Sequence, residues 1–371
     1  MNKKITSAGV ILIIFTIFTS GCVDYLDFND KTTTYESHPT NVAYKITYGY
    51  FVNCSGNGSY NIQYDCDKPD EYVTTEISSL KLLHNTDYEE ITKFGNPLII
   101  WNITKSVEDN YKLGITANVQ SESFLISDLN EDTATTLNEI KTNYTDVYNQ
   151  YTSTQSSNNI LYIDPSDENI SSIAKNILNQ NTNNSFILAK ELFIWLKENT
   201  QYKTHLINND VQPAHVTCIK KTGDCDDLSF LYMSLCRAIG LPARFIRGFL
   251  VSEDDAGQTS AVAHAWVEVF VGNSIGYNGW IPVECAGESE NKGNTNPQVY
   301  QNFGVESAEH LRLYTDDGSN ESLNLSISGP LVLYDTGLTI EMSSFVSIAD
   351  YIVITSKELF IDENEYRSYK S

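Results

Sequence analysis

Alternating apolar and polar positions dominate the first third of the chain. Large apolar or aromatic residues occupy every second position over residues 44–52, and the same period of two returns at 60–64 and 111–119. Such alternation, in segments interrupted by Gly, Asn and Pro, indicates half-buried antiparallel strands. Residues 42–126 are therefore expected to form a small β-sandwich-like domain.

After about residue 128 the apolar period becomes that of a helix. Apolar side chains spaced i, i+3, i+4, i+7 share one face from Leu137 to Tyr151, and again within 170–177 and 187–196. A stretch of Ser, Thr and Asn at 152–159 is expected to be a linker. The fold class predicted is α+β, with an N-terminal antiparallel β-sandwich-like domain followed by a second, α+β domain. The predicted segments after the β domain are a helix and linker (127–159), the α+β domain (160–315) and a C-terminal extension without an assigned role (316–371).

The first 22 residues have the pattern of an export signal. Two lysines precede an apolar stretch at 5–18, and a small-residue site then ends in Cys22. Residues 1–22 resemble a lipoprotein signal with Cys22 as the lipidated residue, although Thr19 stands where Leu is usual. An uncleaved N-terminal membrane anchor is the alternative, since the segment is close to the length of a span. Both readings attach the chain to the extracytoplasmic face of the membrane, with residues 23–41 as a polar tether.

Composition excludes some partners. The 371 residues carry a formal net charge of -24, and no cluster of Lys and Arg offers a surface for nucleic acid. No phosphate-binding glycine loop and no Cys/His spacing of a zinc site occurs, so neither a cofactor nor a metal is expected. Acceptor triplets for N-glycosylation are compatible with export. They lie at Asn53, Asn57, Asn102, Asn143, Asn169, Asn183, Asn320 and Asn324.

The cysteines give one pairing question. Cys54 and Cys66 flank a Gly-rich turn, and a tight hairpin there would leave Cys66 about five residues, at ~3.3 Å each, past the residue opposite Cys54. A disulfide between them is therefore disfavoured. Cys218 and Cys285 could pair or stay free, and Cys236 is expected in the core.

Cys225 begins an apolar-periodic run that Gly240 and Pro242 end, so it is expected in the first turn of a buried helix. The helix dipole there favours a thiolate, whereas the neighbouring acidic side chains oppose it. A cationic histidine partner is therefore required.

Two further segments supply that chemistry. His264 lies on one face of a predicted strand, and Glu284 lies in a short extended run where it could orient an imidazole. Thiol, base and orienting carboxylate together make the catalytic arrangement of thiol and serine hydrolases.

Four motifs resemble the transglutaminase-like superfamily in content and order. They are GDCDDLS at 223–229, GLPAR at 240–244, HAWVE at 264–268 and WIPVE at 280–284. The resemblance covers about residues 160–290 and implies a papain-like α+β fold. It also implies Cys225 as nucleophile, His264 as general base and Glu284 as orienting acid, with Glu in place of the usual Asp.

Further roles follow from the same resemblance. The Cys225 N–H would stabilise an oxyanion, with Gln212 or His215 as candidate second donor. Trp266 and Trp280 are candidate substrate-binding residues, or else walls of the core or cleft. Asp227 and Arg244 are expected to serve structure.

The resulting hypothesis is a surface-anchored thiol enzyme. It would cleave peptide or carboxamide bonds through a Cys thioester, or transfer their acyl group, with a peptide, protein or cell-wall peptide as substrate. The alternative is a catalytically inactive binding or scaffold module with the same fold at the cell surface. Glu284 in place of Asp and the acidic neighbours of Cys225 are the features that favour this alternative.

Overall fold

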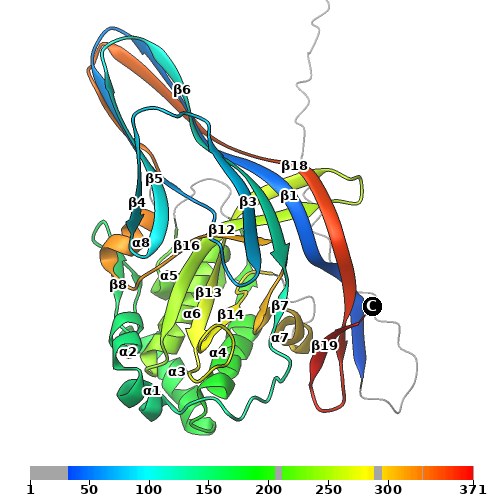
Figure 1. The fold of residues 1–371 in the computed structure, drawn as a ribbon. Coiled ribbons are helices and arrows are strands. Elements are labelled where there is room, and N and C mark those ends of the chain that lie inside the picture. Colours follow the sequence, from blue (N-terminus) through cyan, green and yellow to red (C-terminus); the bar gives the residue numbers. More distant parts are fainter. Residues whose placement is uncertain (1–31, 205–210, 288–294, 328, 371) are drawn as a thin grey trace, which may run out of the picture.

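The computed structural model describes residues 32–204, 211–287, 295–327 and 329–370. It is an α+β structure in which antiparallel β-sheets come first and an α/β region follows (Figure 1), so the predicted fold class is confirmed. The predicted signal at 1–22, including Cys22, lies outside the described residues. None of the helices in the described ranges is long and apolar enough to cross a membrane.

Two antiparallel sheets form a β sandwich, with strand orders β19-β18-β1-β6-β3 and β17-β2-β5-β4. Their inward side chains enclose one core that includes Tyr48, Tyr60, Trp101 and Tyr111. The strands of the first sheet are β1 (Thr33–Gly56), β3 (Thr75–Leu82), β6 (Asp109–Glu122), β18 (Leu338–Ile361) and β19 (Arg367–Lys370). Those of the second are β2 (Tyr60–Asp67), β4 (Tyr88–Lys93), β5 (Asn96–Lys105) and β17 (Leu331–Tyr334).

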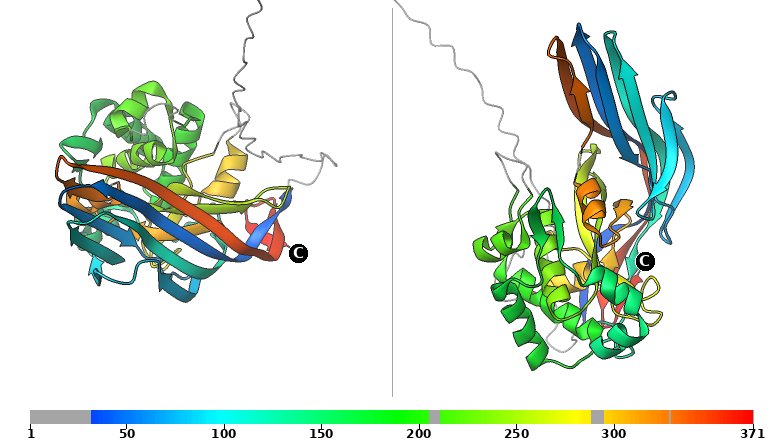
Figure 2. Two further views of the ribbon diagram at one scale, coloured as in Figure 1. Left: turned by 90° about the horizontal axis from the view of Figure 1, so that it is seen from above. Right: turned by 90° about the vertical axis from the view of Figure 1, so that its left-hand side faces the viewer.

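The C-terminal segment, which had no assigned role, completes both sheets. β18 pairs with β1 from Thr33↔Ile361 to Gly56↔Leu338, and β17 pairs with β2. The two long strands lie side by side along the sandwich in Figures 1 and 2. Residues 33–41, expected in a tether, belong to β1, so that part of the prediction is wrong. Polar residues are held there by backbone hydrogen bonds to a strand from the other end of the chain, which alternation cannot reveal.

The expected hairpin after Cys54 is also absent. β1 and β2 lie in different sheets, and the chain between them crosses from one sheet to the other. Cys54 and Cys66 are both buried and free, as are Cys218, Cys236 and Cys285. The sequence disfavoured a Cys54–Cys66 bridge only on the assumption of a tight hairpin, and that hairpin is not formed.

The α/β region is built on a four-stranded sheet with the order β14-β13-β12-β16. Helix α6 packs on it, and every residue from Asp227 to Arg237 is buried. Gly240, at φ +81, follows α6 where the C-cap was predicted. The sheet strands are β12 (Ala243–Glu253), β13 (Thr259–Phe270), β14 (Trp280–Val283) and β16 (His310–Thr315). The helices are α1 (Leu137–Asn143), α2 (Thr145–Tyr151), α3 (Glu168–Gln180), α4 (Ser185–Asn199), α5 (Ala214–Lys220), α6 (Cys225–Ala238), α7 (Asn296–Asn302) and α8 (Asn320–Ser326).

Three short strand pairs complete the region, and one of them includes residues that were predicted to form a linker. They are β7 (Phe124–Leu125) with β15 (Val305–Glu306), β8 (Gln155–Ser157) with β9 (Ile160–Ile163), and β10 (Gln201–Tyr202) with β11 (Thr222–Gly223). β8 falls inside the expected linker at 152–159. The single helix expected from Leu137 to Tyr151 is broken at Tyr144. Thr142 and Thr145 donate to carbonyls four residues back, a side-chain bond that bends helices.

Arg367 anchors the last strand to the α/β region. It is 1 % exposed, and its guanidinium donates to the carbonyls of Ile126, Tyr300 and Phe303 at 2.5–2.9 Å. Burial without a carboxylate partner lowers the pKa of Arg367 to about 9. The guanidinium thus satisfies carbonyls from two separate segments that would otherwise be buried and unpaired.

Replacing Arg367 with Met should destabilise the protein by about 3 kcal/mol, because several buried carbonyls lose their donor. Chemical denaturation followed by circular dichroism measures this. Lys370→Met, on the same strand but exposed, is the matched control and should change stability by less than about 0.5 kcal/mol. Equal stability of the two variants would contradict the anchoring role.

Candidate active site

Cys225 is the first residue of α6, directly after the short strand β11. Asp227 fixes this turn: its carboxylate accepts from the backbone N–H of Gln212 at 2.6 Å and of Asp224 at 3.2 Å. Gly223 is required here, since an added Cβ would lie 2.5 Å from Cβ of Asp227. As the first helical residue, Cys225 has a backbone N–H without an acceptor inside the helix. The thiol therefore sits at a pre-formed helix N-terminus, and Asp227 serves structure as expected.

His264 joins Cys225 to Glu284. Its Nε2–H donates to Oε2 of Glu284 at 2.6 Å, and its ring interacts with the Cys225 thiol closely enough for each group to shift the pKa of the other. Because Glu284 occupies Nε2, Nδ1 is the ring nitrogen left for the sulfur. The structure thus brings together all three residues that the motifs suggested, in the order thiol, imidazole, carboxylate.

Glu284 follows β14 in a segment held by a buried lysine. Lys197 from α4 donates to the carbonyls of Cys285 at 2.6 Å and Ala286 at 2.5 Å. The N–H of Ala286 donates to Oε1 of Glu284 at 2.7 Å. Burial lowers the pKa of Lys197 to about 8. The carboxylate is therefore positioned through its own backbone segment.

The charges at the site favour a cationic His264. Burial lowers the pKa of His264, but the Glu284 carboxylate and the hydrogen bond to Cys225 outweigh it and raise that pKa to about 10. Burial also raises the pKa of Glu284, and His264 and His310 reverse this and hold it far below its usual range. For Cys225, burial raises the thiol pKa above its ordinary value, with a further contribution from Asp226 and Asp224, and His264 is the group that lowers it. An imidazolium is therefore the charge that can stabilise a thiolate here.

The acidic neighbours of Cys225 are less negative than the sequence suggests. Burial and a hydrogen bond with Asp224 raise the pKa of Asp226, which favours its uncharged form. Asp227 is bound by three N–H groups. Asp226 and Asp224 nevertheless still raise the pKa of the Cys225 thiol.

Gln212 is already engaged. Its side-chain amide donates to Asp227 at 2.7 Å and to the carbonyl of Thr222 at 3.3 Å, and its Oε1 accepts from Lys220 at 2.7 Å. As an oxyanion donor it would have to give up one of these bonds. His215, the other candidate donor, is exposed on α5.

Trp266 lies beside His264, with ring centroids 6.1 Å apart, and is 1 % exposed. Its Nε1 donates to Glu306 at 3.2 Å. Arg312 binds the same Glu306 oxygen at 2.8 Å and Oε1 of Glu268 at 2.6 Å. Trp266 therefore closes the space behind His264, and its role as a substrate-binding residue stays a prediction.

Arg244 has the expected structural role. Its Nε donates to Oε2 of Glu268 at 2.7 Å, and its guanidinium lies 4.1 Å from the ring centre of Trp280. This ion pair is the second half of the buried network around Glu268.

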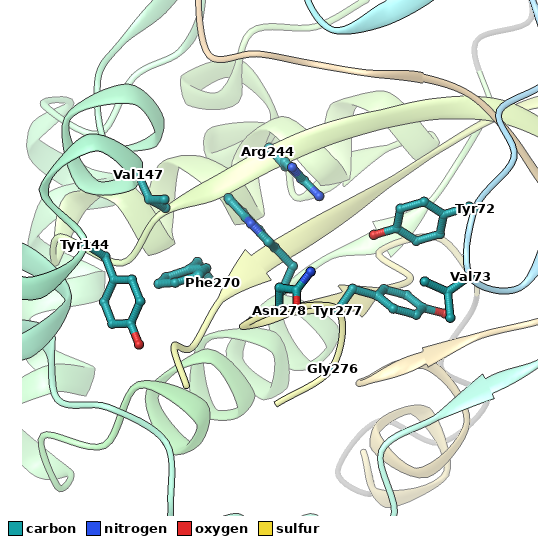
Figure 3. Close-up of a pocket in the computed structure, with 10 residues that line it drawn as sticks. Tyr72, Val73, Tyr144, Val147, Arg244, Phe270, Gly276, Tyr277 and Asn278 are labelled. Atoms are coloured by element: carbon teal, nitrogen blue, oxygen red, sulfur yellow. The ribbon is translucent and has the colours of Figure 1, made fainter. Parts of the chain in front are cut away.

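Trp280 lies elsewhere. It pairs with Phe270 at the far end of β13 and lines a pocket of about 580 Å³ (Figure 3) with Tyr72, Arg244 and Tyr277. Phe270 is six residues beyond His264 on β13, about 20 Å at ~3.3 Å per residue. The structure does not bring Trp280 to the thiol.

His310 is a site residue that the sequence did not suggest. It is the first residue of β16, and its Nε2 lies 2.9 Å from Oε2 of Glu284. The sequence EHLRLY around it reads as an ordinary short strand, and only the fold brings that strand to Glu284. The metal-binding groups of His264, Glu284 and His310 lie within 4.8 Å of one another. Because these atoms are hydrogen-bonded to each other, the cluster is complete without an ion.

Comparison with known proteins gives one family match. Residues 171–285 match the model of the transglutaminase-like superfamily, so this segment is a transglutaminase-like domain within a longer chain. None of the curated proteins with which the sequence was compared matches it.

One solved structure shares the fold at low sequence identity, and two others align more weakly. The crystal structure titled "a Putative Cysteine Protease from Cytophaga hutchinsonii" aligns with a TM-score of 0.53 and 14% identity, over 91% of this chain and 100% of the other. The periplasmic domain of TgpA from Pseudomonas aeruginosa aligns with a TM-score of 0.32 and 12% identity, over 70% and 94% of the two chains. LapG from Legionella pneumophila gives 0.25 and 14%, over 41% and 83%. The last two TM-scores are too low to support an argument.

Replacing Glu284 with Gln should lower the pKa of His264 from about 10 to its ordinary value or below, because burial then acts without the carboxylate. His264 is charged below its pKa, so the imidazolium would be lost at lower pH in the variant. NMR titration of labelled histidine measures this. Glu253→Gln, at the end of β12, is the control, and an unchanged His264 titration in the Glu284 variant would refute the assignment.

Proposed function

We propose that the chain is a thiol enzyme that acts on peptide or carboxamide bonds. The observation that carries the proposal is the set Cys225–His264–Glu284, in which His264 is hydrogen-bonded to Glu284 and interacts with a sulfur at a helix N-terminus. The transglutaminase-like match over residues 171–285 supports the same chemistry, because it includes Cys225, His264 and Glu284.

The geometry suggests how each group would act. The Cys225 thiolate attacks the carbonyl carbon, forming a C–S bond and an oxyanion beside the Cys225 N–H. The His264 imidazolium then gives its proton to the leaving nitrogen as the C–N bond breaks, leaving a thioester and an amine. Water or a second amine attacks the thioester, His264 accepts its proton, and the thiolate leaves. Glu284 keeps the imidazole oriented through both steps.

Replacing Cys225 with Ala should abolish labelling by an iodoacetamide probe and reduce hydrolysis of a peptide library by about 10³-fold or more. The other cysteines of the described residues are buried, so labelling of the folded protein reports on Cys225 when Cys22 is replaced by Ala in every variant. Cys218→Ala is the control and should label normally.

The competing function is a binding module without turnover. Wild-type protein with a thiol pKa near the unperturbed ~8.5 and no action on any library peptide, with or without an added amine, would favour that module and reject the enzyme. Turnover that depends on Cys225 would reject the module.

We also propose that the protein acts at the extracytoplasmic face of the membrane, attached through a lipid on Cys22. The proposal rests on the signal-like residues 1–22. Its substrate would then be a surface protein or a cell-wall peptide.

Cys22→Ala should prevent incorporation of a fatty-acid analogue and shift the protein from the membrane fraction to the soluble fraction. An unlabelled wild-type protein that still sediments with membranes would instead indicate an uncleaved apolar anchor. Cys54→Ala is the matched control, because that cysteine is buried in the sandwich.

A further inference from the structure

His310 shares one carboxylate oxygen with His264. Oε2 of Glu284 accepts from Nε2 of His264 at 2.6 Å and from Nε2 of His310 at 2.9 Å. The two imidazole rings are 5.3 Å apart, and both residues are 8 % exposed. The second histidine therefore touches the acid rather than the thiol.

Gly248 makes this approach possible. β12 lies between β13 and β16, and its Gly248 pairs with both His264 and Arg312. A Cβ at Gly248 would lie 1.9 Å from the carbonyl oxygen of Leu311, so β16 approaches β12 too closely for any side chain. With no side chain on the intervening strand, rings from β13 and β16 meet over it.

The length of Glu284 gives the second histidine a function. Glu has one more rotatable bond than Asp, so its carboxylate has more orientations to lose when it is fixed. Ala286 N–H holds Oε1 at 2.7 Å, and the two histidines hold Oε2 from different strands. Donors from three segments leave the carboxylate one orientation.

The other ring nitrogen argues against a purely space-filling role. Nδ1 of His310 is buried and has no hydrogen-bond partner among the described residues. An unpaired buried nitrogen is unfavourable, and an apolar ring would pack on Trp266, 4.9 Å away, without that cost. The donor at Nε2 is what an apolar ring could not supply.

We propose that His310 is a positioning residue, which fixes the Glu284 carboxylate through its Nε2–H so that the same oxygen orients His264. The inference rests on the proposed function, since it assigns His310 a place in that same site. It predicts that replacing His310 impairs the site by releasing the Glu284 carboxylate, and not by weakening substrate binding.

The test compares two replacements. His310→Phe keeps a ring against Trp266 but removes the donor, and should lower kcat about tenfold or more with KM changed less than about threefold. His310→Gln keeps an N–H donor and should restore most of that loss. His310→Leu replaces the Phe variant if the latter does not fold, which melting temperature decides. His84→Phe, in the β sandwich, is the control for a His→Phe change far from the site.

A second readout needs no substrate. The rate of Cys225 alkylation by iodoacetamide as a function of pH should fall at neutral pH in the Phe variant and recover in the Gln variant. Glu284→Asp combined with each variant completes a double-mutant cycle, in which a positioning role predicts a coupling between the two sites.

Failure of the inference and failure of the proposed function are distinguishable. Wild-type kinetics and alkylation in His310→Phe would overturn the inference, as would a folded Gln variant as impaired as the Phe variant. A wild-type protein that turns over nothing would overturn the proposed function. The alkylation profiles would then still decide whether His310 acts through Glu284.

Discussion

The site depends on the carboxylate of Glu284. Its charge makes His264 a cation, and that cation is what can stabilise a thiolate on Cys225. The carboxylate is buried, which by itself disfavours its charge, so it must be surrounded by donors. The donors are the backbone N–H of Ala286 and the rings of His264 and His310, and Lys197 holds the backbone segment that follows Glu284. Elements as distant in sequence as α4 and β16 therefore converge on one side chain.

The local elements around the chemistry could be predicted from sequence because their signals are local. The run from Cys225 to Gly240 has a helical period and a glycine at its end, and HAWVE lies in a segment rich in Val and Ala that forms a strand buried from His264 to Phe270. These signals needed no knowledge of distant partners. The three site residues could be predicted because each has a definite place in its motif. Cys225 begins a helix, His264 lies on one face of a strand, and Glu284 directly follows a strand.

What sequence could not predict is pairing between distant segments. β18 shows few buried positions, because most of its side chains are exposed or half-buried, and it is held by backbone bonds to β1. His310 could not be predicted for the same reason. No motif surrounds it in the sequence, and only the close approach of β16 to β12 at Gly248 brings it to Glu284. The hairpin expected after Cys54 failed because a Gly-rich turn can also carry the chain from one sheet to another.

The charges near Cys225 in the sequence do not include the one that the fold adds, which is the cation on His264. Three acidic residues near Cys225 predict repulsion of a thiolate, and the net charge of -24 is also unfavourable for a further negative charge. In the fold, burial and Asp224 raise the pKa of Asp226, and the Asp227 carboxylate accepts from N–H groups of Gln212 and Asp224. His264, in contrast, is charged where a free histidine would not be. At the sulfur, burial, Asp226 and Asp224 raise the thiol pKa, and His264 lowers it. The cation that Glu284 maintains on His264 is therefore the group on which any thiolate at Cys225 depends.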